Sequence, residues 1–194
     1  MRFKIFNFKK VTSTNDTAIN LIKEKKKEIG CVCAEEQSNG RGRHGKKWIS
    51  YSGNIFTSLF FPLKKNYPKF SEFSIINSIL ISDVIKFFCK NKGINLKFPN
   101  DIMINNKKVC GLLQELITLN NKEFLIIGIG INIISSPGFQ SNYETTNILL
   151  ETKKKVDKKE MIKLIITSYE DFFRSIKSYK YISFKKKADL MVLK

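Results

Sequence analysis

The most unusual stretch of the sequence is QSNGRGRHGKKW, residues 37–48, which combines three glycines, two arginines and two lysines. It also holds the single histidine, His44, and the single tryptophan, Trp48, of the chain. Glycines let a backbone approach a ligand closely, arginines pair with phosphate oxygens, and an aromatic ring can stack on a base. The stretch therefore predicts a loop that folds over an anionic ligand.

Two other interpretations of this loop stay open. It is similar to arginine- and glycine-rich segments that bind RNA, although those are repetitive and this is a single copy between two predicted strands. An ordinary solvated loop would account for its charge but not for its glycines or Trp48. The GxGxxG spacing of Gly40, Gly42 and Gly45 does not indicate a Rossmann fold, because a strand rather than a helix follows it.

Three further stretches combine polar groups with glycine or proline. KFPND (97–101) places a carboxamide and a carboxylate directly after a proline, and NNKKVCGLLQE (105–115) brings Lys108 close to Gly111. GIGIN (128–132) carries two glycines inside an apolar strand, where they weaken the strand unless something must approach its backbone. These stretches are candidates for the rest of a ligand site.

Hydrophobic periodicity predicts the elements that position these stretches. Strands are expected at 2–8, 31–36, 53–61, 95–98, 102–104, 108–118 and 124–133, helices at 14–27, 70–90 and 157–178, and a loop at 135–147. Ser13 and Thr14 supply an N-cap for the first helix, and the Asn105-Asn106 and Asn120-Asn121 pairs supply turns between strands. This order predicts an α+β fold with a mixed, mostly antiparallel sheet flanked by helices.

Composition limits the class of protein. The chain has 194 residues, 42% of them hydrophobic, which is enough for one domain with a substantial core. Its longest apolar run, 124–134, is too short to span a bilayer and no secretory signal is evident, so we expect a cytoplasmic protein without a membrane partner. The cysteines at 31, 33, 89 and 110 form a poor zinc pattern and are expected to be reduced core residues.

The formal net charge of +18 allows two explanations. A polyanionic partner such as nucleic acid is one. The other is an AT-biased genome, because the excess is nearly all lysine, spread from Lys4 to Lys194 and accompanied by many Ile, Asn and Phe. We favour the second explanation, and nucleic acid is not the expected partner.

Six motifs together resemble the biotin–protein ligase family, and they occur in that family's order: STN (13–15), EEQSNGRGRHGKKW (35–48), GNIF (53–56), KFPND (97–101), KKVCGLLQE (107–115) and GIGIN (128–132). The resemblance implies a catalytic domain similar to those of class II aminoacyl-tRNA synthetases and biotin–lipoate ligases. It also implies an enzyme that uses Mg²⁺ and ATP to convert biotin into biotinyl-5′-AMP. Biotin is then transferred to a lysine of an acidic biotin carboxyl carrier protein.

The resemblance further implies roles for individual residues. Four polar residues would hydrogen-bond the biotin head group: Ser13, Thr14, Asn15 and Gln37. Three glycines would admit the ligand to the backbone: Gly111, Gly128 and Gly130. Six residues would contact ATP or the adenylate: Arg41, Arg43, Trp48, Asn100, Lys108 and Asn132. The expected catalytic residues are Lys108, Arg43 and Asp101.

Within that set, Arg43 would lie nearest the phosphate and Trp48 would stack on the adenine. Lys108 would bridge the biotin carboxylate and the α-phosphate. Asp101 would either help to hold Mg²⁺ or position the incoming lysine, and these two roles stay open. The family's usual KWPND is KFPND here, so Phe98 lacks the N–H donor of an indole, and Cys110 stands where alanine is more usual.

Domain organisation and competing functions complete the sequence-based expectations. We expect a catalytic domain over 1–180 and a short basic tail over 181–194, without the N-terminal helix-turn-helix or C-terminal β-barrel domain of many relatives. A homodimer built by aligned sheet edges stays open. The alternatives are a lipoate or octanoate ligase or transferase of the same superfamily, and a basic nucleic-acid-binding protein.

Overall fold

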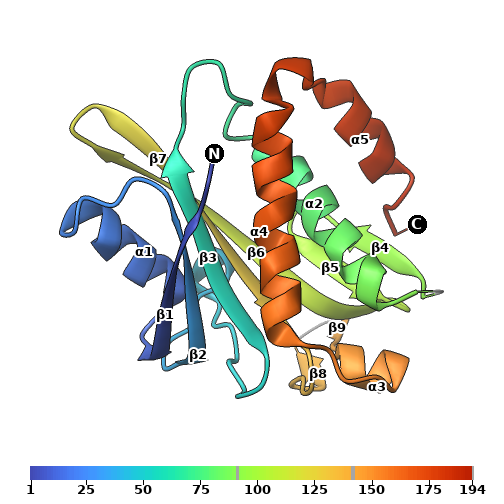
Figure 1. The fold of residues 1–194 in the computed structure, drawn as a ribbon. Coiled ribbons are helices and arrows are strands. Elements are labelled where there is room, and N and C mark those ends of the chain that lie inside the picture. The colour runs from blue at the N-terminus through green and yellow to red at the C-terminus, as the bar shows by residue number, and fades with distance from the viewer. Residues whose placement is uncertain (91, 141–142, 194) are drawn as a thin grey trace.

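The chain folds into a mixed β-sheet with helices on both faces (Figure 1). A computed structural model describes residues 1–90, 92–140 and 143–193. The strands of the main sheet are β1 (Lys4–Val11), β2 (Gly30–Gln37), β3 (Ile55–Pro62), β4 (Ile94–Lys97), β5 (Asp101–Ile104), β6 (Lys107–Leu119) and β7 (Lys122–Ile131). The helices are α1 (Thr14–Lys23), α2 (Phe73–Phe88), α3 (Ile148–Thr152), α4 (Lys158–Arg174) and α5 (Tyr181–Asp189), with 3₁₀ turns η1 (Arg43–Gly45) and η2 (Ile176–Ser178). A separate small hairpin pairs β8 (Phe139–Gln140) with β9 (Tyr143–Glu144).

The main sheet has the strand order β1-β2-β3-β7-β6-β5-β4. β1 and β2 are parallel, and every other neighbouring pair is antiparallel. Asn105-Asn106 and Asn120-Asn121 make the turns before and after β6, and all four residues have positive φ, which asparagine tolerates better than most residues. The predicted α+β class with a mixed, mostly antiparallel sheet is confirmed.

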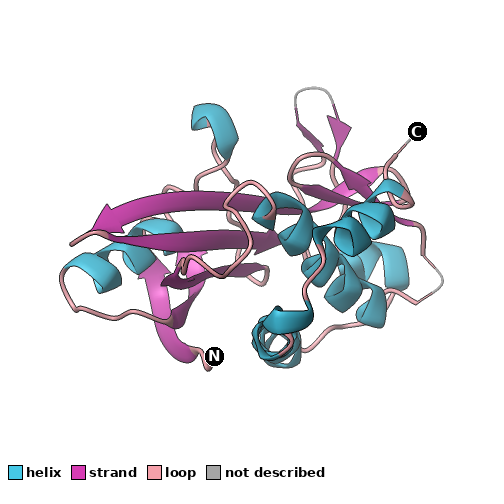
Figure 2. Ribbon diagram, turned by 90° about the horizontal axis from the view of Figure 1, so that it is seen from above, coloured by secondary structure: helices cyan, strands magenta, loops and turns pink. Residues whose placement is uncertain are grey.

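The two faces of the sheet pack against different helices because successive side chains of a strand point in opposite directions. Val32 and Phe60 pack with α1, whereas their neighbours Cys31 and Phe61 belong to the core formed with α2 and α4. Figures 1 and 2 show α2, α4 and α5 gathered together, with α1 lying apart from them. All four cysteines are buried and free, as predicted.

Local sequence explains where the site-bearing helix begins. Ser13 has an extended backbone and its hydroxyl accepts a hydrogen bond from the Asp16 N–H, so the predicted N-cap of α1 is confirmed. The helix ends at Lys23 rather than at residue 27, because the run EKKKE (24–28) offers no apolar side chain to pack. α1 is therefore short, and its N-terminal turn rather than its length matters for the site.

Three segments in the C-terminal half of the chain differ from the sequence-based expectation. The expected loop 135–147 contains the β8–β9 hairpin, and the predicted helix 157–178 ends at Arg174, before η2. Residues 181–189, expected within a basic tail, form α5, which packs against α2 with Ala188 fully buried. The sequence did not predict this helix, because it is rich in lysine and its apolar residues are few and widely spaced. The domain division at residue 180 stays a prediction.

Within the described part of the chain, no helix is long and apolar enough to cross a bilayer.

Phe61 offers a test of the core between the sheet and the helices. Its ring is fully buried on β3, with ring centroids 6.1, 5.7 and 4.8 Å from those of Phe3, Phe73 and Phe173. We expect Phe61→Ala to lower the free energy of unfolding by about 3–5 kcal/mol in urea denaturation, because it removes these contacts and leaves a cavity. Phe87→Ala, at a side chain that is 55% exposed, should change it by no more than about 0.5 kcal/mol. Equal effects of the two substitutions would contradict this packing.

Candidate active site

A cavity of about 480 Å³ opens on the α1 face of the sheet. Its floor is formed by β6 and β7, one wall by the start of α1, and its cover by residues of the basic loop. All the site residues expected from the sequence line it except Asn132. Residues up to 117 positions apart, such as Ser13 and Gly130, therefore meet in one space because the sheet order places their elements side by side.

The basic loop is an ordered small hairpin. Arg41 and Lys47 form an antiparallel bridge, the Gly42 N–H donates to the Lys46 carbonyl at 2.6 Å, and η1 makes the turn. His44 and Gly45 both have positive φ, as the central residues of a tight hairpin turn require. The loop therefore has a defined shape.

Trp48 lies directly on two glycines of the cavity floor. Gly111 on β6 and Gly130 on β7 face each other in register, and a Cβ on either would come within 2.6 Å of the Trp48 ring. The indole Nε1 is buried and has no hydrogen-bond partner among the described residues. Bare backbone at both positions is what allows the ring to lie this close to the sheet.

One end of the cavity is lined by uncharged polar groups. Gln37 accepts hydrogen bonds from the Thr14 N–H at 2.8 Å and from the Thr14 hydroxyl at 3.1 Å. The Ser58 hydroxyl lies 2.8 Å from Thr14 Oγ1 and 2.5 Å from Asn15 Oδ1. Asn15 itself rests on Gly128, where a Cβ would stand 2.4 Å from its Oδ1. These contacts build a polar pocket from α1, β2, β3 and β7.

The other end carries charge. Lys108 Nζ lies 2.8 Å from Asp101 Oδ1, and the two side chains are only 10% and 13% exposed. Arg43 reaches toward the same end, where its Nη1 lies 3.4 Å from Asn100 Oδ1. Asn100 is fixed by two hydrogen bonds with the Leu112 backbone. Lys108 also stands 5.3 Å from the Trp48 ring centroid, so the charged end adjoins the aromatic ring.

A β-bulge brings Lys108 into the cavity. Ile102 pairs with Cys110 and Met103 pairs with Lys108, so Val109 is an extra residue on β6. In a regular strand, Lys108 and Gly111 would point to opposite faces, because their positions differ by an odd number. The bulge shifts this alternation, and Lys108 Cε lies 3.3 Å from where a Gly111 Cβ would be. The sequence predicted that Lys108 and Gly111 lie close together, but not the bulge that brings them together.

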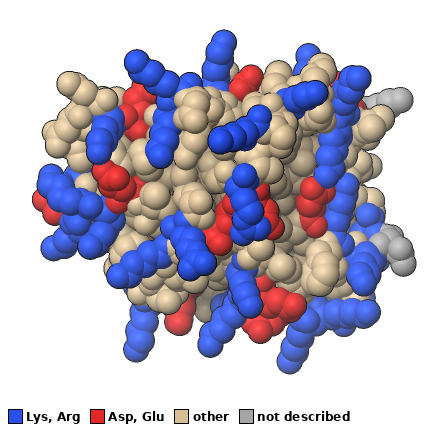
Figure 3. Space-filling view, turned by 45° about the horizontal axis from the view of Figure 1, so that its top comes forward, with Lys and Arg blue, Asp and Glu red and all other residues tan. Residues whose placement is uncertain are grey.

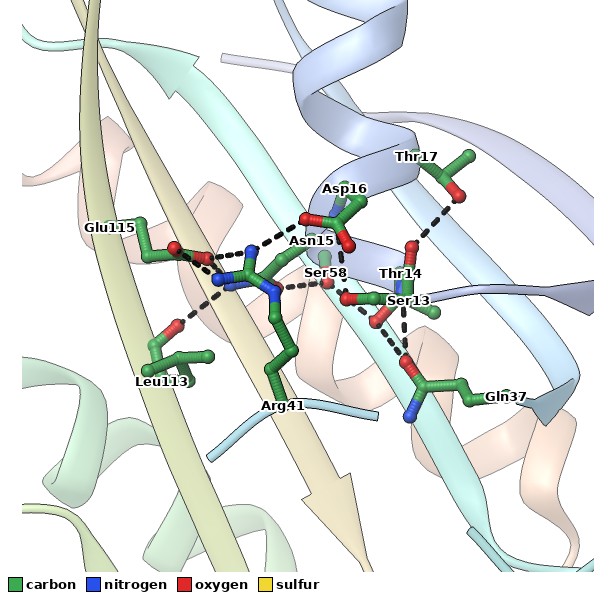
Figure 4. Close-up of polar contacts among 10 residues, drawn as sticks. All are labelled: Ser13, Thr14, Asn15, Asp16, Thr17, Gln37, Arg41, Ser58, Leu113 and Glu115. Carbon is green, nitrogen blue, oxygen red and sulfur yellow. Dashed lines mark hydrogen bonds and ion pairs between the residues drawn. The ribbon is translucent and has the colours of Figure 1, made fainter. Parts of the chain in front are cut away.

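Sequence reasoning missed Glu115, Asp16 and Ser58. Arg41 pairs with both oxygens of Glu115 at 2.8 and 2.7 Å and with Asp16 at 2.7 Å (Figure 4). Burial by itself lowers the pKa of Arg41, but the hydrogen bonds and charge of Glu115, assisted by Asp16, outweigh burial and raise this pKa above its ordinary value. The sequence did hold a signal for the two acidic residues. Asp16 directly follows the motif STN (13–15), and Glu115 is the last residue of the motif KKVCGLLQE (107–115).

Asn132 lies outside the main cavity. Its carboxamide donates to the Thr146 carbonyl at 3.1 Å, and it lines a much smaller neighbouring cavity that also borders Trp48 and Lys108. Among the residues that the structure describes, no three His, Cys, Asp or Glu side chains gather as a metal site. Among the described residues that line the cavity, Asp101 supplies the carboxylate at the charged end, which suits a Mg²⁺ ion that takes its other ligands from phosphate and water.

The cavity is thus suited to an elongated ligand with an uncharged polar head at one end and an anionic group at the other. The chain belongs to the Biotin/lipoate A/B protein ligase family, whose sequence model matches residues 6–132. The resemblance drawn from the six motifs is confirmed.

Individual relatives agree with this family. The chain is 32% identical over 125 residues to the bifunctional ligase/repressor BirA of Escherichia coli, covering 63% of this chain and 38% of that protein. It spans 38–64% of the length of five bacterial relatives that it matches.

Solved structures extend the similarity over nearly the whole chain. A biotin protein ligase from Leishmania major in complex with biotin has a TM-score of 0.86 and 25% identity, covering 98% of this chain and 82% of that chain. A biotin protein ligase from Aquifex aeolicus in complex with biotin and ATP has a TM-score of 0.80 and 26% identity, covering 98% and 78%.

The glycine floor can be tested through the single tryptophan. We expect Gly130→Ala to shift Trp48 fluorescence emission to longer wavelength, because a Cβ 2.5 Å from the ring forces it off the sheet toward water. Gly93→Ala is the matched control, since its Cβ would meet only Asn105 Oδ1 at 3.7 Å. Identical emission from both variants and the parent protein would contradict the position of Trp48.

Proposed function

We propose that this chain is the catalytic part of a biotin–protein ligase. It joins biotin and ATP to give biotinyl-5′-AMP and pyrophosphate, and then transfers biotin to a lysine of a biotin carboxyl carrier protein. The observation that carries this proposal is a single cavity that places an ordered uncharged pocket beside Lys108 and Arg43 under Trp48. Family membership and the biotin ligases among its relatives support the same function.

The first step joins a carboxylate to a phosphorus atom surrounded by negative oxygens. One carboxylate oxygen of biotin attacks the α-phosphorus, and the bond from that phosphorus to the bridging oxygen of pyrophosphate breaks. Lys108 lies at the charged end and would pair with both anions, while Arg43 from the hairpin would offset charge on the phosphate. Mg²⁺ bound with Asp101 would offset further negative charge on the triphosphate.

The uncharged pocket would orient biotin for the first step. Thr14, Asn15 and Gln37 line the pocket with hydroxyl and carboxamide groups, which suit the ureido ring of biotin because that ring contains both donors and acceptors. The side chain of biotin would then run over Gly111, Gly128 and Gly130 toward Lys108. Trp48 would stack on the adenine, with Asn100 and Asn132 beside the nucleotide.

The second step transfers the acyl group to a protein amine. The carrier lysine attacks the carbonyl carbon of the mixed anhydride, the bond to the AMP oxygen breaks, and a proton leaves the amine. Asp101 lies at the charged end, where it would orient the incoming amine. The hairpin would cover the anhydride and shield it from water between the two steps.

Two alternatives remain in view. Lipoate or octanoate could be activated by the same chemistry, and the family to which the chain belongs includes lipoate ligases as well as biotin ligases. The acid that is activated must therefore be tested directly. Nucleic-acid binding would call for a continuous basic surface, but Figure 3 shows lysine and arginine side chains scattered over one face with Asp and Glu side chains among them. A dispersed positive charge fits an encounter with an acidic carrier domain.

The deciding experiment mixes the protein with Mg-ATP and biotin, lipoate or octanoate in separate reactions and measures acyl-AMP by mass spectrometry. We expect biotinyl-AMP alone. A lipoyl or octanoyl adenylate would replace biotin with that acid, and the absence of any adenylate would overturn the proposal.

Neighbouring lysines provide a matched test of the charged end. We expect Lys108→Ala and Arg43→Ala each to slow adenylate formation by about 10²–10³-fold, because each removes a positive charge from the developing transition state. Lys107→Ala should retain the parent rate, since Lys107 is 45% exposed and pairs with Glu144. Thermal unfolding of all three variants controls for folding, and parent-like rates in the first two would mean that the charged end is assigned incorrectly.

A further inference from the structure

Glu115 on β6 contacts two other parts of the site, Arg41 of the basic hairpin and Asn15 of α1 (Figure 4). It lies on β6, on the same face as Gly111 and Leu113, and its side chain is 25% exposed. Its two carboxylate oxygens accept hydrogen bonds from Nη1 and Nη2 of Arg41 in a bidentate ion pair, with distances of 2.8 and 2.7 Å. This geometry fixes the direction of the guanidinium as well as its position.

The same carboxylate also holds Asn15. Asn15 Nδ2 donates to Glu115 Oε2 at 2.6 Å and to the Leu113 carbonyl at 3.3 Å. Its Oδ1 lies against the Ser58 hydroxyl at 2.5 Å. Because a carboxylate accepts but cannot donate, Glu115 forces the NH₂ group of Asn15 toward itself and the carbonyl oxygen toward Ser58.

Asp16 extends this network to α1. Arg41 Nη2 lies 2.7 Å from Asp16 Oδ1, and Asp16 is in the first turn of the helix that Ser13 caps. One guanidinium therefore joins the basic hairpin, β6 and the start of α1. Two carboxylates occupy its terminal nitrogens, whereas Arg43 points to the charged end of the cavity.

We propose that Glu115 is a positioning residue for the biotin pocket, acting through Arg41 and Asn15. It fixes the orientation of the Asn15 carboxamide in the wall of the pocket and anchors the base of the basic hairpin over the pocket. The two arginines of the hairpin then differ in role, with Arg41 holding the hairpin in place and Arg43 serving the phosphate. This inference rests on the proposed function for the identity of the ligand.

Steady-state kinetics separate positioning from catalysis. In Glu115→Gln, an amide replaces one acceptor oxygen, so Arg41 and Asn15 can no longer both be held. We expect the KM for biotin in adenylate formation to rise by about tenfold to a hundredfold, as loss of a hydrogen bond to a charged group implies, with KM for ATP within about twofold and kcat much less affected. Glu28→Gln is the matched control, because it removes a carboxylate from an exposed ion pair with Lys122 and should leave all three constants unchanged.

A double-mutant cycle tests whether Glu115 acts through Arg41. If the two residues form one unit, Arg41→Gln combined with Glu115→Gln should raise the KM for biotin by less than the product of the single effects. Multiplicative effects would show that the residues act independently and would overturn the proposed route. A KM for biotin in Glu115→Gln equal to that of the parent would overturn the proposal altogether.

Amide hydrogen exchange gives a readout that does not depend on the ligand. We expect exchange at Gly42 and Trp48, whose N–H groups donate within the hairpin, to become about tenfold faster in Glu115→Gln but not in Glu28→Gln. Unchanged exchange would overturn the anchoring role even if the parent protein formed no biotinyl-AMP. Failure of the parent with biotin, combined with faster exchange in Glu115→Gln, would instead reject the proposed function and keep the anchor.

Discussion

Three glycines on the central strands β6 and β7 determine how closely the rest of the site can approach the sheet. A Cβ on Gly111, Gly128 or Gly130 would stand 2.4–2.6 Å from Trp48 or Asn15, which is closer than packed atoms allow. Because these positions are bare, the start of α1 and the end of the hairpin rest directly on backbone. The cavity depends on this approach, since its polar pocket and its aromatic ring are both held in place by it.

Charge is arranged around that floor in two separate groups. Lys108 pairs with Asp101 at the charged end of the cavity, and Arg41 pairs with Glu115 and Asp16 beside the uncharged pocket. Removing one member of a well-buried pair such as Lys108–Asp101 is costly, because the remaining charge stays away from water without a partner. Pairs of this kind hold side chains in defined positions, which the proposed acyl activation needs before the substrates bind.

Much of the fold follows from local patterns. Ser13 predicted the start of α1, and the Asn-Asn pairs predicted two turns, because both depend on the conformational preferences of a few neighbouring residues. α5 was missed, since its lysines resemble a solvated tail and only its contact with α2 makes it a stable helix. The β8–β9 hairpin was missed within a segment that has turn residues but little periodicity.

The sequence by itself determined the family and predicted most of the residues that line the cavity, because six short motifs keep their residues adjacent along the chain. Tertiary structure decided how those residues meet. The extra residue Val109 turns Lys108 toward Gly111, and Glu115 finds Arg41 and Asn15 at separations of 74 and 100 residues. Such contacts cannot be predicted from the spacing of residues along the chain, since they arise only when strand order and register bring distant segments together.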